Sequence, residues 1–294
     1  MKLDPFCIEC QIRRQRLTAE KMGDPAATKA FLTDCLRILA DAPDEIAAPW
    51  LAPRFYEAWV RYFPDMDRYA DNKRDSNDYA LSRETSLRAR IEGAEDPLYT
   101  ALTLSRVGNY LDFAALGDSV SFAELDALTE AAMADSVDPR EFERFKADLA
   151  GAKKLLLLTD NAGEIVYDKL LLEQIKKAYP GVELVTAVRG GNALNDATRA
   201  DAIQVGLDQV SRLTDNGTSI PGTQLGECSE EFLQEFHSAD LILSKGQGNF
   251  ETLWGCGANV YYLFLCKCEL FVKLFSVPKL TGMFVNERRI EMRK

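Results

Sequence analysis

The spacing of apolar residues changes near residue 150. Before that point apolar residues recur at intervals of three and four, which is typical of amphipathic helices, as in Phe31, Leu32, Cys35, Leu36 and Leu39. This spacing predicts helices over residues 5–40, 44–63, 82–94, 97–116 and 122–149. Ser121 is the expected N-cap of the last helix. We expect a loop at the polar run 71–78 and no strand in this half of the chain.

After Gly151, short apolar runs alternate with helical segments. Strands are expected at 154–159, 182–188, 241–244 and 260–265. Helices are expected at 164–179, 197–206 and 229–238. This alternation indicates βαβ units and therefore an α/β fold with a mostly parallel sheet. We expect an α-helical cap or bundle in residues 1–148 and the α/β domain in residues 149–294.

The composition is that of a globular protein and narrows the list of partners. The chain has 294 residues, 47% apolar and 28% charged, so a packed core is expected. A net charge of −11 without any basic run argues against nucleic acid as a partner. Lys267, Glu269 and Lys273 interrupt the apolar stretch 260–274, so we expect no membrane span. Seven cysteines without a secretion signal indicate reduced thiols in the cytoplasm.

Polar side chains and glycines follow three of the predicted strands. They are Asp160 and Asn161 after the strand at 154–159, Arg189, Gly190 and Asp196 after the strand at 182–188, and Lys245, Gly246, Gly248, Asn249 and Glu251 after the strand at 241–244. In an open α/β sheet, ligands bind beyond the carboxyl ends of the strands. We therefore expect these residues to converge at one edge of the sheet.

The residue types at this edge favour a hard divalent cation and a phosphate group. Asp160, Asn161 and Asp196 offer the oxygen ligands that Mg²⁺ or Mn²⁺ prefers. The single histidine, His237, falls on a predicted helix, which excludes a zinc site built on histidines. Lys245 is a cation suited to phosphate oxygens, as is the arginine after the second strand. The neighbouring glycines allow backbone N–H groups to approach an anion.

Each of these features also has a simpler interpretation. A single Asp-Asn pair after a strand often caps a helix, a glycine pair often forms a turn, and a lysine is usually solvated. An aspartyl-phosphate mechanism would make Asp160 the nucleophile, but the usual second aspartate is replaced by Ala162. The chain lacks a Walker loop, and the first strand is followed by only one glycine, unlike a Rossmann dehydrogenase or methyltransferase. A non-catalytic binder of phosphorylated metabolites stays open.

Four segments carry a resemblance to a known family. They are TDNAGEIVYD (159–168), VRGGNALNDAT (188–198), DNGTSIPGT (215–223) and KGQGNFETL (245–253). They resemble the DUF89 family of metal-dependent damage-control phosphatases, and GNYLDF (108–113) is similar to that family's Gly-Asn-x-x-Asp segment. Cys7-x-x-Cys10 and the Gly-Gln-Gly-Asn run resemble its mainly prokaryotic branch. The resemblance covers residues 1 to about 285 in unchanged motif order.

The resemblance implies a fold, a ligand set and a substrate class. It implies a three-layer α/β/α sandwich with a helical N-terminal region. It implies metal ligands at Asp160, Asn161 and Asp196, a phosphate-contacting Lys245, and Asn109 facing the same cleft. Its members hydrolyse small phosphate esters such as sugar phosphates, often damaged ones, with Mn²⁺, Mg²⁺, Co²⁺ or Ni²⁺. A carboxyl methyltransferase activity that uses S-adenosylmethionine has also been attributed to the family.

Several questions stay open at this level. Cys7 and Cys10 have the spacing of thiolate ligands for a structural metal, or form a packed, reduced pair. The family's Lys-Cys-Pro after the last long strand is here Lys267-Cys268 followed by Glu269. The attacking group is either water or Asp160. The natural substrate, the metal in the cell and the oligomeric state are not readable.

Overall fold

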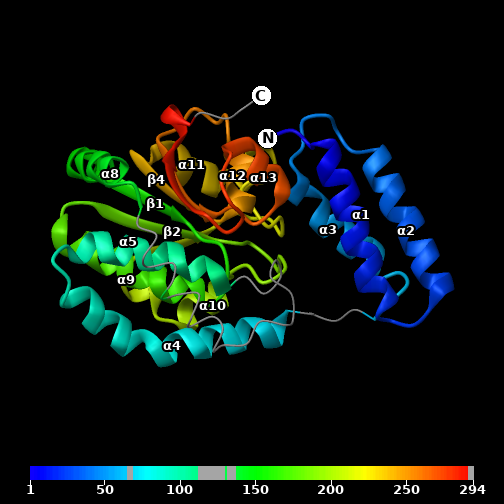
Figure 1. Cartoon of the computed structure of the whole chain (residues 1–294), viewed down its shortest axis with the longest axis horizontal. Helices are drawn as coiled ribbons and strands as arrows, with labels where there is room; N and C mark the ends of the chain where they lie inside the picture. Colours follow the sequence, from blue (N-terminus) through cyan, green and yellow to red (C-terminus); the bar gives the residue numbers. More distant parts are fainter. Residues whose placement is uncertain (65–68, 112–129, 131–136, 291–294) are drawn as a thin grey trace.

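A six-stranded sheet forms the centre of the computed structural model, which describes residues 1–64, 69–111, 130 and 137–290 (Figure 1). The strands are β1 (Lys154–Leu158), β2 (Glu183–Val188), β3 (Arg212–Asp215), β4 (Leu241–Lys245), β5 (Val260–Leu265) and β6 (Gly282–Asn286). Their order is β3-β2-β1-β4-β5-β6, and only β5 and β6 pair antiparallel. The predicted mostly parallel sheet is confirmed. The order reverses between β1 and β4, which is where ligands bind in such sheets.

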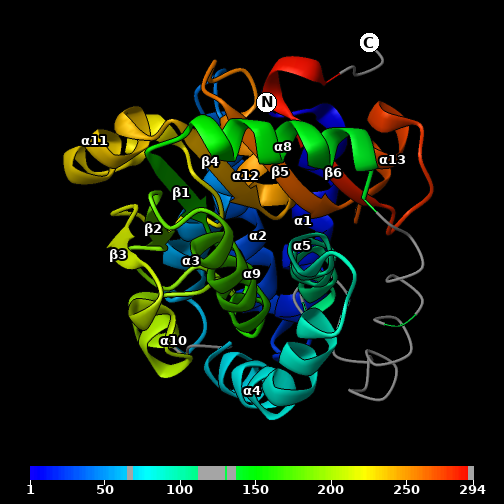
Figure 2. The same cartoon turned by 90° about the vertical axis from the view of Figure 1, so that its left-hand side faces the viewer.

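Helices cover both faces of the sheet, which confirms the three layers (Figure 2). One layer contains α4 (Ala70–Glu92), α5 (Pro97–Gly108), α8 (Pro139–Gly151), α9 (Glu164–Ala178) and α10 (Arg199–Gln204). The other contains α11 (Glu230–Ser238), α12 (Gln247–Leu253) and α13 (Glu269–Phe275). Successive side chains of a strand point to opposite faces, so Leu155 and Leu157 pack into the first layer and Leu156 and Leu158 into the second.

Three N-terminal helices pack around a core of their own. They are α1 (Pro5–Glu20), α2 (Pro25–Ala40) and α3 (Leu51–Trp59). Their core is centred on Phe31, Phe55 and Trp59, and the rings of Phe31 and Trp59 meet edge to face at 5.5 Å. In contrast, α4 and α5 share the core of the sheet. The proposed division of the chain between residues 148 and 149 stays a prediction.

The polar run 71–78 is helical, so the loop expected there was wrong. It forms the start of α4, and several of its polar side chains are buried. Lys73 Nζ lies 2.7 Å from Asp201 Oδ2, and Asn77 Nδ2 donates to Asp201 Oδ1 at 3.2 Å. Asn77 Oδ1 accepts from the N–H of Gly163 at 2.6 Å. One side of this polar helix therefore contacts other elements while the other side is exposed, which a pattern of hydrophobicity does not reveal.

Two strands, β3 and β6, and two short helices, α12 and α13, were not expected. β3 and β6 carry few apolar residues at buried positions, because they form the two edges of the sheet. The segment after β4 forms α12 with Gly246 as its N-cap. The prediction of a cap at Ser121 lies outside the described residues. In the described part of the chain, no helix combines the length and apolarity needed to cross a bilayer.

Candidate active site at the carboxyl ends of the strands

The loops that follow β1 and β2 are joined by backbone contacts. Asn161 and Asp196 form an isolated antiparallel bridge. The N–H of Ala197 donates to the carbonyl of Asp160 at 2.7 Å, and the N–H of Ala162 donates to the carbonyl of Asn195 at 2.9 Å. The parallel sheet therefore brings the predicted metal ligands to one place.

The two carboxylates of this site are buried and held by polar partners. Asp160 and Asp196 are 7% and 3% exposed. Arg189 Nε lies 2.6 Å from Asp196 Oδ2, forming a buried ion pair. Asn161 Nδ2 donates to Asp160 Oδ2 at 2.8 Å, and Asn161 Oδ1 accepts from Asn195 Nδ2 at 2.8 Å. Burial of charge at this density is costly and marks the edge of the sheet as a functional site.

Gly246 brings the end of β4 against Asp160. Its φ is +77°, a conformation that side chains rarely adopt. A Cβ at this position would lie 2.0 Å from Asp160 Oδ2. Only glycine therefore allows the strand neighbouring β1 to approach the carboxylate so closely.

Lys245 is the last residue of β4 and is fully buried. Its Nζ lies 2.6 Å from Asp168 Oδ1 and 2.7 Å from Glu164 Oε1, and donates to the carbonyl and hydroxyl of Ser105 at 2.8 and 2.9 Å. Burial alone would lower the pKa of Lys245, but the two carboxylates outweigh burial and raise it. Burial raises the pKa of Asp168 to about 6 despite the neighbouring ammonium group. The lysine is thus charged and bound by protein groups, and its contact with phosphate stays a prediction.

Sequence reasoning missed the partners of this lysine. Glu164 and Asp168 are one helical turn apart in α9, and Ser105 comes from α5. The sequence did contain a signal for them, because Glu164 and Asp168 are four residues apart on a predicted helix whose neighbouring residues are mostly apolar. A charge on a buried helix face requires a partner and points to a site.

Asn109 connects the helical layer to the carboxylates. It ends α5, and its Nδ2 donates to Asp160 Oδ2 and Glu164 Oε2, both at 2.9 Å. Its Oδ1 accepts from the N–H of Leu265 at 3.4 Å. A Cβ on Gly108 would lie 3.2 Å from the ring of Tyr167, so this glycine lets α5 approach α9. Asn109 therefore lies beside Asp160, and its predicted place at a substrate cleft stays a prediction.

Three other predicted phosphate-binding residues hold the loops to one another. A Cβ on Gly190 would lie 2.6 Å from the backbone of Gly217, and one on Gly248 would lie 2.2 Å from the carbonyl of Pro221. Asn249 Nδ2 donates to the carbonyls of Lys245 and of the residue before Asp160, at 2.6 and 3.0 Å. These contacts fix the shape of the site, and the predicted phosphate contacts stay predictions.

Glu251 lies beside the N-terminus of the chain. Its Oε1 accepts from Gln247 Nε2 at 2.8 Å, and its carbonyl accepts from the Met1 ammonium. Burial raises the pKa of Glu251 to about 7, against the opposing effects of Gln247 and the N-terminal charge. Its predicted contact with phosphate stays a prediction.

The raised pKa of Glu251 predicts a pH-dependent gain of stability in Glu251→Gln. A carboxyl group whose folded pKa exceeds its unfolded value of 4.5 contributes stability below pH 4.5 that is lost as pH rises through about 7. Glutamine resembles the protonated acid at every pH. From pH 4.5 to pH 7, the difference in free energy of unfolding, variant minus wild type, should increase by about 1.4 kcal/mol for each pH unit. Urea unfolding at pH 5 and at pH 8 measures the gain, with exposed Glu230→Gln as control. An equal difference at both pH values would refute it.

The cysteines near the N-terminus lie apart from the carboxylates. Cys7 is half-buried and Cys10 exposed, both in the first half of α1. The Cys7 thiol is near enough to Cys268 to interact with it electrostatically, and burial raises the pKa of Cys7 to about 12. Among the residues that the structure describes, no three His, Cys, Asp or Glu side chains are grouped to hold a metal. The structural metal at Cys7 and Cys10 stays a prediction.

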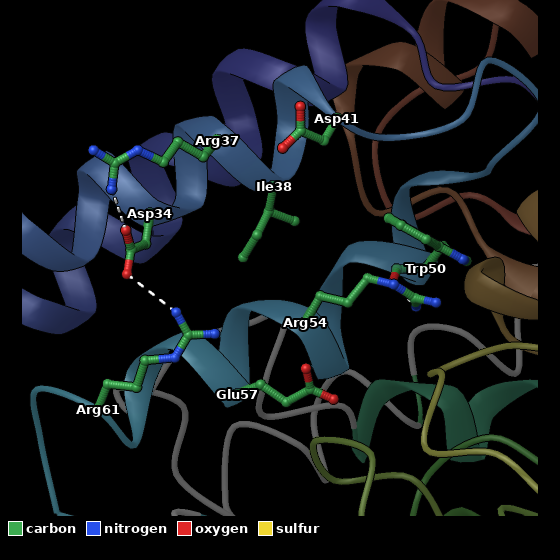
Figure 3. A pocket seen from close by; sticks show the side chains of 8 residues that line it. All are labelled: Asp34, Arg37, Ile38, Asp41, Trp50, Arg54, Glu57 and Arg61. Carbon is green, nitrogen blue, oxygen red and sulfur yellow. Dashed lines mark hydrogen bonds and ion pairs between the residues drawn. The ribbon is translucent and has the colours of Figure 1, made fainter.

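A groove on the N-terminal helices is separate from this site (Figure 3). It has a volume of about 310 Å³ between α2 and α3, with Asp34 bridging Arg37 and Arg61. Trp50 Nε1 and Arg54 Nη2, at its other end, donate to Glu227 Oε1 at 2.7 and 3.1 Å. None of the predicted site residues lines it.

The residues at the strand ends fit a divalent cation. Asp160, Asn161 and Asp196 present carboxylate and amide oxygens, with neither His nor Cys among them. The cluster contains four acidic side chains, Asp160, Glu164, Asp168 and Asp196, and two basic ones, Arg189 and Lys245. Acidic side chains therefore outnumber basic ones by two in a buried place. One or two carboxylates, completed by water and phosphate, are the usual shell of Mg²⁺.

The chain is similar over most of its length to three archaeal proteins. The chain is 31% identical to a damage-control phosphatase of Archaeoglobus fulgidus, over 92% of this chain and 93% of the relative. It is 28% identical to a damage-control phosphatase of Pyrococcus horikoshii, over 95% and 96%. It is 30% identical to an uncharacterised protein of Methanocaldococcus jannaschii, over 92% and 90%.

The fold and the family model agree with these relatives. The crystal structure of a DUF89 family protein from Pyrococcus horikoshii superposes with a TM-score of 0.83 at 25% identity, covering 98% of this chain and 99% of that one. The model of the damage-control phosphatase ARMT1-like domain matches residues 3–281, which include every strand of the sheet except the last. The loops that meet around Asp160 and Asp196 thus lie within a chain that belongs to the damage-control phosphatase ARMT1-like domain family, also called DUF89.

Proposed function

We propose that this chain is a divalent-metal-dependent phosphatase that hydrolyses phosphate monoesters of small metabolites, such as sugar phosphates or related damaged compounds. The observation that carries the proposal is the buried cluster of acidic and amide oxygen ligands at the carboxyl ends of β1 and β2. The names of two archaeal relatives, which are damage-control phosphatases, support the same reaction.

In this proposal Asp160, Asn161 and Asp196 hold Mn²⁺, Mg²⁺, Co²⁺ or Ni²⁺. Such an ion offsets the charge of a phosphate group and favours attack at phosphorus. Arg189 supplies a second contact, because its Nη2 is buried without a hydrogen-bond acceptor among the described residues and can donate to a phosphate oxygen. Lys245 adds positive charge to the site from the end of β4. The predicted contacts of substrate with Asn109, Gly190, Gly246, Gly248, Asn249 and Glu251 belong to the same proposal.

Water is the attacking group in this scheme. Asp160 Oδ2 accepts hydrogen bonds from two side-chain amides, those of Asn109 and Asn161. Such bonds stabilise the carboxylate and reduce its tendency to attack phosphorus. A carboxylate held in this way is better suited to binding a cation.

The turn after β1 argues against a methyltransferase. Nucleotide-type cofactors bind there when glycines leave room for them. Here a Cβ on Gly163 would lie 2.7 Å from the carbonyl of Ser76, so α4 already fills that space.

The seven free cysteines support placing the protein in the cytoplasm.

Hydrolysis of p-nitrophenyl phosphate by metal-free protein tests the proposal. We expect no turnover in the presence of EDTA and turnover on addition of at least one of Mn²⁺, Mg²⁺, Co²⁺ and Ni²⁺, because the phosphate charge is then neutralised. A panel of sugar phosphates with the best metal would identify the substrate class. Binding of phosphate esters without turnover at any metal would identify a non-catalytic binder instead, and heat released with S-adenosylmethionine in calorimetry would indicate a methyltransferase.

A further inference from the structure

Glu164 lies between the proposed metal ligands and the buried lysine. It begins α9, directly after the turn that carries Asp160 and Asn161, and its side chain is fully buried. Its Oε1 lies 2.7 Å from Lys245 Nζ. Its Oε2 accepts from Asn109 Nδ2 at 2.9 Å, from Asn161 Nδ2 at 2.8 Å and from the Asn161 N–H at 3.3 Å. One carboxylate therefore links the lysine to both asparagines beside Asp160.

This carboxylate decides which way the Asn161 amide faces. A side-chain amide has one donor end and one acceptor end. Asn161 Nδ2 is held by Asp160 Oδ2 and Glu164 Oε2, both at 2.8 Å. A flipped amide would place its oxygen against two carboxylate oxygens, which repel it. Asn161 Oδ1 therefore faces the loop after β2, where Asn195 Nδ2 donates to it and where Asp196 lies.

We propose that Glu164 is a positioning residue of the metal site, which orients Asn161 so that the side-chain oxygen of Asn161 is available to the ion. The inference rests on the metal-dependent function proposed above. A charged group that fixes a metal ligand typically contributes ten- to hundredfold in metal affinity. The same carboxylate also partners Lys245, so the negative charge of Glu164 is compensated without the ion and the ligand geometry exists before the ion binds.

Asp168 provides the matched comparison. It lies one turn further along α9, is equally buried, and pairs with Lys245 Nζ at 2.6 Å. Its Oδ1 also accepts from the Ser105 hydroxyl at 2.6 Å. Among its described hydrogen bonds, none involves an asparagine of the site. Glu164→Gln and Asp168→Asn therefore remove the same charge from the same helix, but only the first disturbs Asn161.

The test is equilibrium binding of Mn²⁺ to metal-free protein, with free Mn²⁺ measured by electron paramagnetic resonance. In Glu164→Gln one end of the new amide presents a donor to Lys245 or to the asparagines, so the orientation of Asn161 is no longer fixed. We expect the Mn²⁺ affinity of this variant to fall by about ten- to hundredfold. We expect Asp168→Asn to lose clearly less than about tenfold. Circular dichroism and urea unfolding check that both variants are folded.

A second variant keeps the proposal testable if Glu164→Gln does not fold. Glu164→Asp keeps the charge near Lys245 but withdraws the carboxylate from both asparagines, and we expect the same loss of Mn²⁺ affinity. Wild-type affinity in a folded Glu164 variant, or an equal loss in Asp168→Asn, would overturn the positioning role. If the wild-type protein does not bind Mn²⁺, the same comparison is made with Mg²⁺, Co²⁺ and Ni²⁺ by calorimetry. Failure to bind any of the four ions would overturn the proposed metal-dependent function and, with it, this inference.

Discussion

Asp196→Asn is expected to lower metal-dependent phosphate ester hydrolysis by at least about a thousandfold, since a catalytic metal contributes several kcal/mol to the transition state. The substitution removes the charge of one of two carboxylates proposed to hold the ion. It keeps an oxygen that can accept a hydrogen bond from Arg189 Nε. In the wild type, Arg189 Nε lies 2.6 Å from Asp196 Oδ2. Initial rates with p-nitrophenyl phosphate over a range of metal concentrations measure the effect.

Alanine is the weaker choice at this position. It would leave the buried Arg189 without its partner, and an unpaired buried charge costs about 3–5 kcal/mol of stability. Loss of activity would then be confused with loss of fold. Asp240→Asn is a suitable control, because Asp240 caps the opposite, amino-terminal edge of the sheet, accepting from the N–H of Lys153 at 2.8 Å. Near wild-type rates for Asp196→Asn would refute the assignment.

Gly246→Ala is expected to reduce activity by about a hundredfold, because displacement of a reacting group by about 1 Å can cost that much. The new methyl group would occupy the place of the Asp160 carboxylate, 2.0 Å from Oδ2, so either Asp160 or the end of β4 must move. A side chain at φ +77° adds local strain of about 1–3 kcal/mol. Activity and the free energy of unfolding are both to be measured.

Gly257→Ala separates the clash from the strain. Gly257 has a φ of +78°, and a Cβ there would meet nothing within 4 Å. Its replacement should therefore destabilise the protein by the strain of a side chain at positive φ, about 1–3 kcal/mol. The rate of hydrolysis should stay close to that of the wild type. If both alanine variants lost activity to the same degree, the approach of Gly246 to Asp160 would not be the cause.

The sheet and the meeting of its loops could be predicted from sequence. Leucine, valine and aromatic runs revealed β1, β2, β4 and β5, because strands buried on both faces are apolar throughout. Parallel order then placed Asp160 and Asp196 at one edge, where the structure has them bridged through Asn161. The edge strands β3 and β6 gave no such signal, since only part of each is buried.

The partners of the charged residues could not be predicted. Lys245 was expected at the phosphate, but whether it faces a ligand or Glu164 and Asp168 depends on how α9 packs against β4. Similarly, a loop was expected at Lys73 and Asn77 because this run is polar, and their partner Asp201 lies more than a hundred positions away in the sequence. Hydrophobic spacing identifies the buried face of a helix only when that face is apolar.

The cluster at the strand ends draws its members from parts of the chain that lie far apart in sequence. Asn109, Asp160, Asp196 and Lys245 come from the end of α5 and from the ends of three strands or the loops after them. No such arrangement survives in the denatured chain, so an ion bound there is lost on unfolding. By mass action, a ligand at a hundred times its dissociation constant would add about 2.7 kcal/mol and raise the melting temperature. Thermal scans against metal ions thus offer a way to find the physiological ion before any substrate is known.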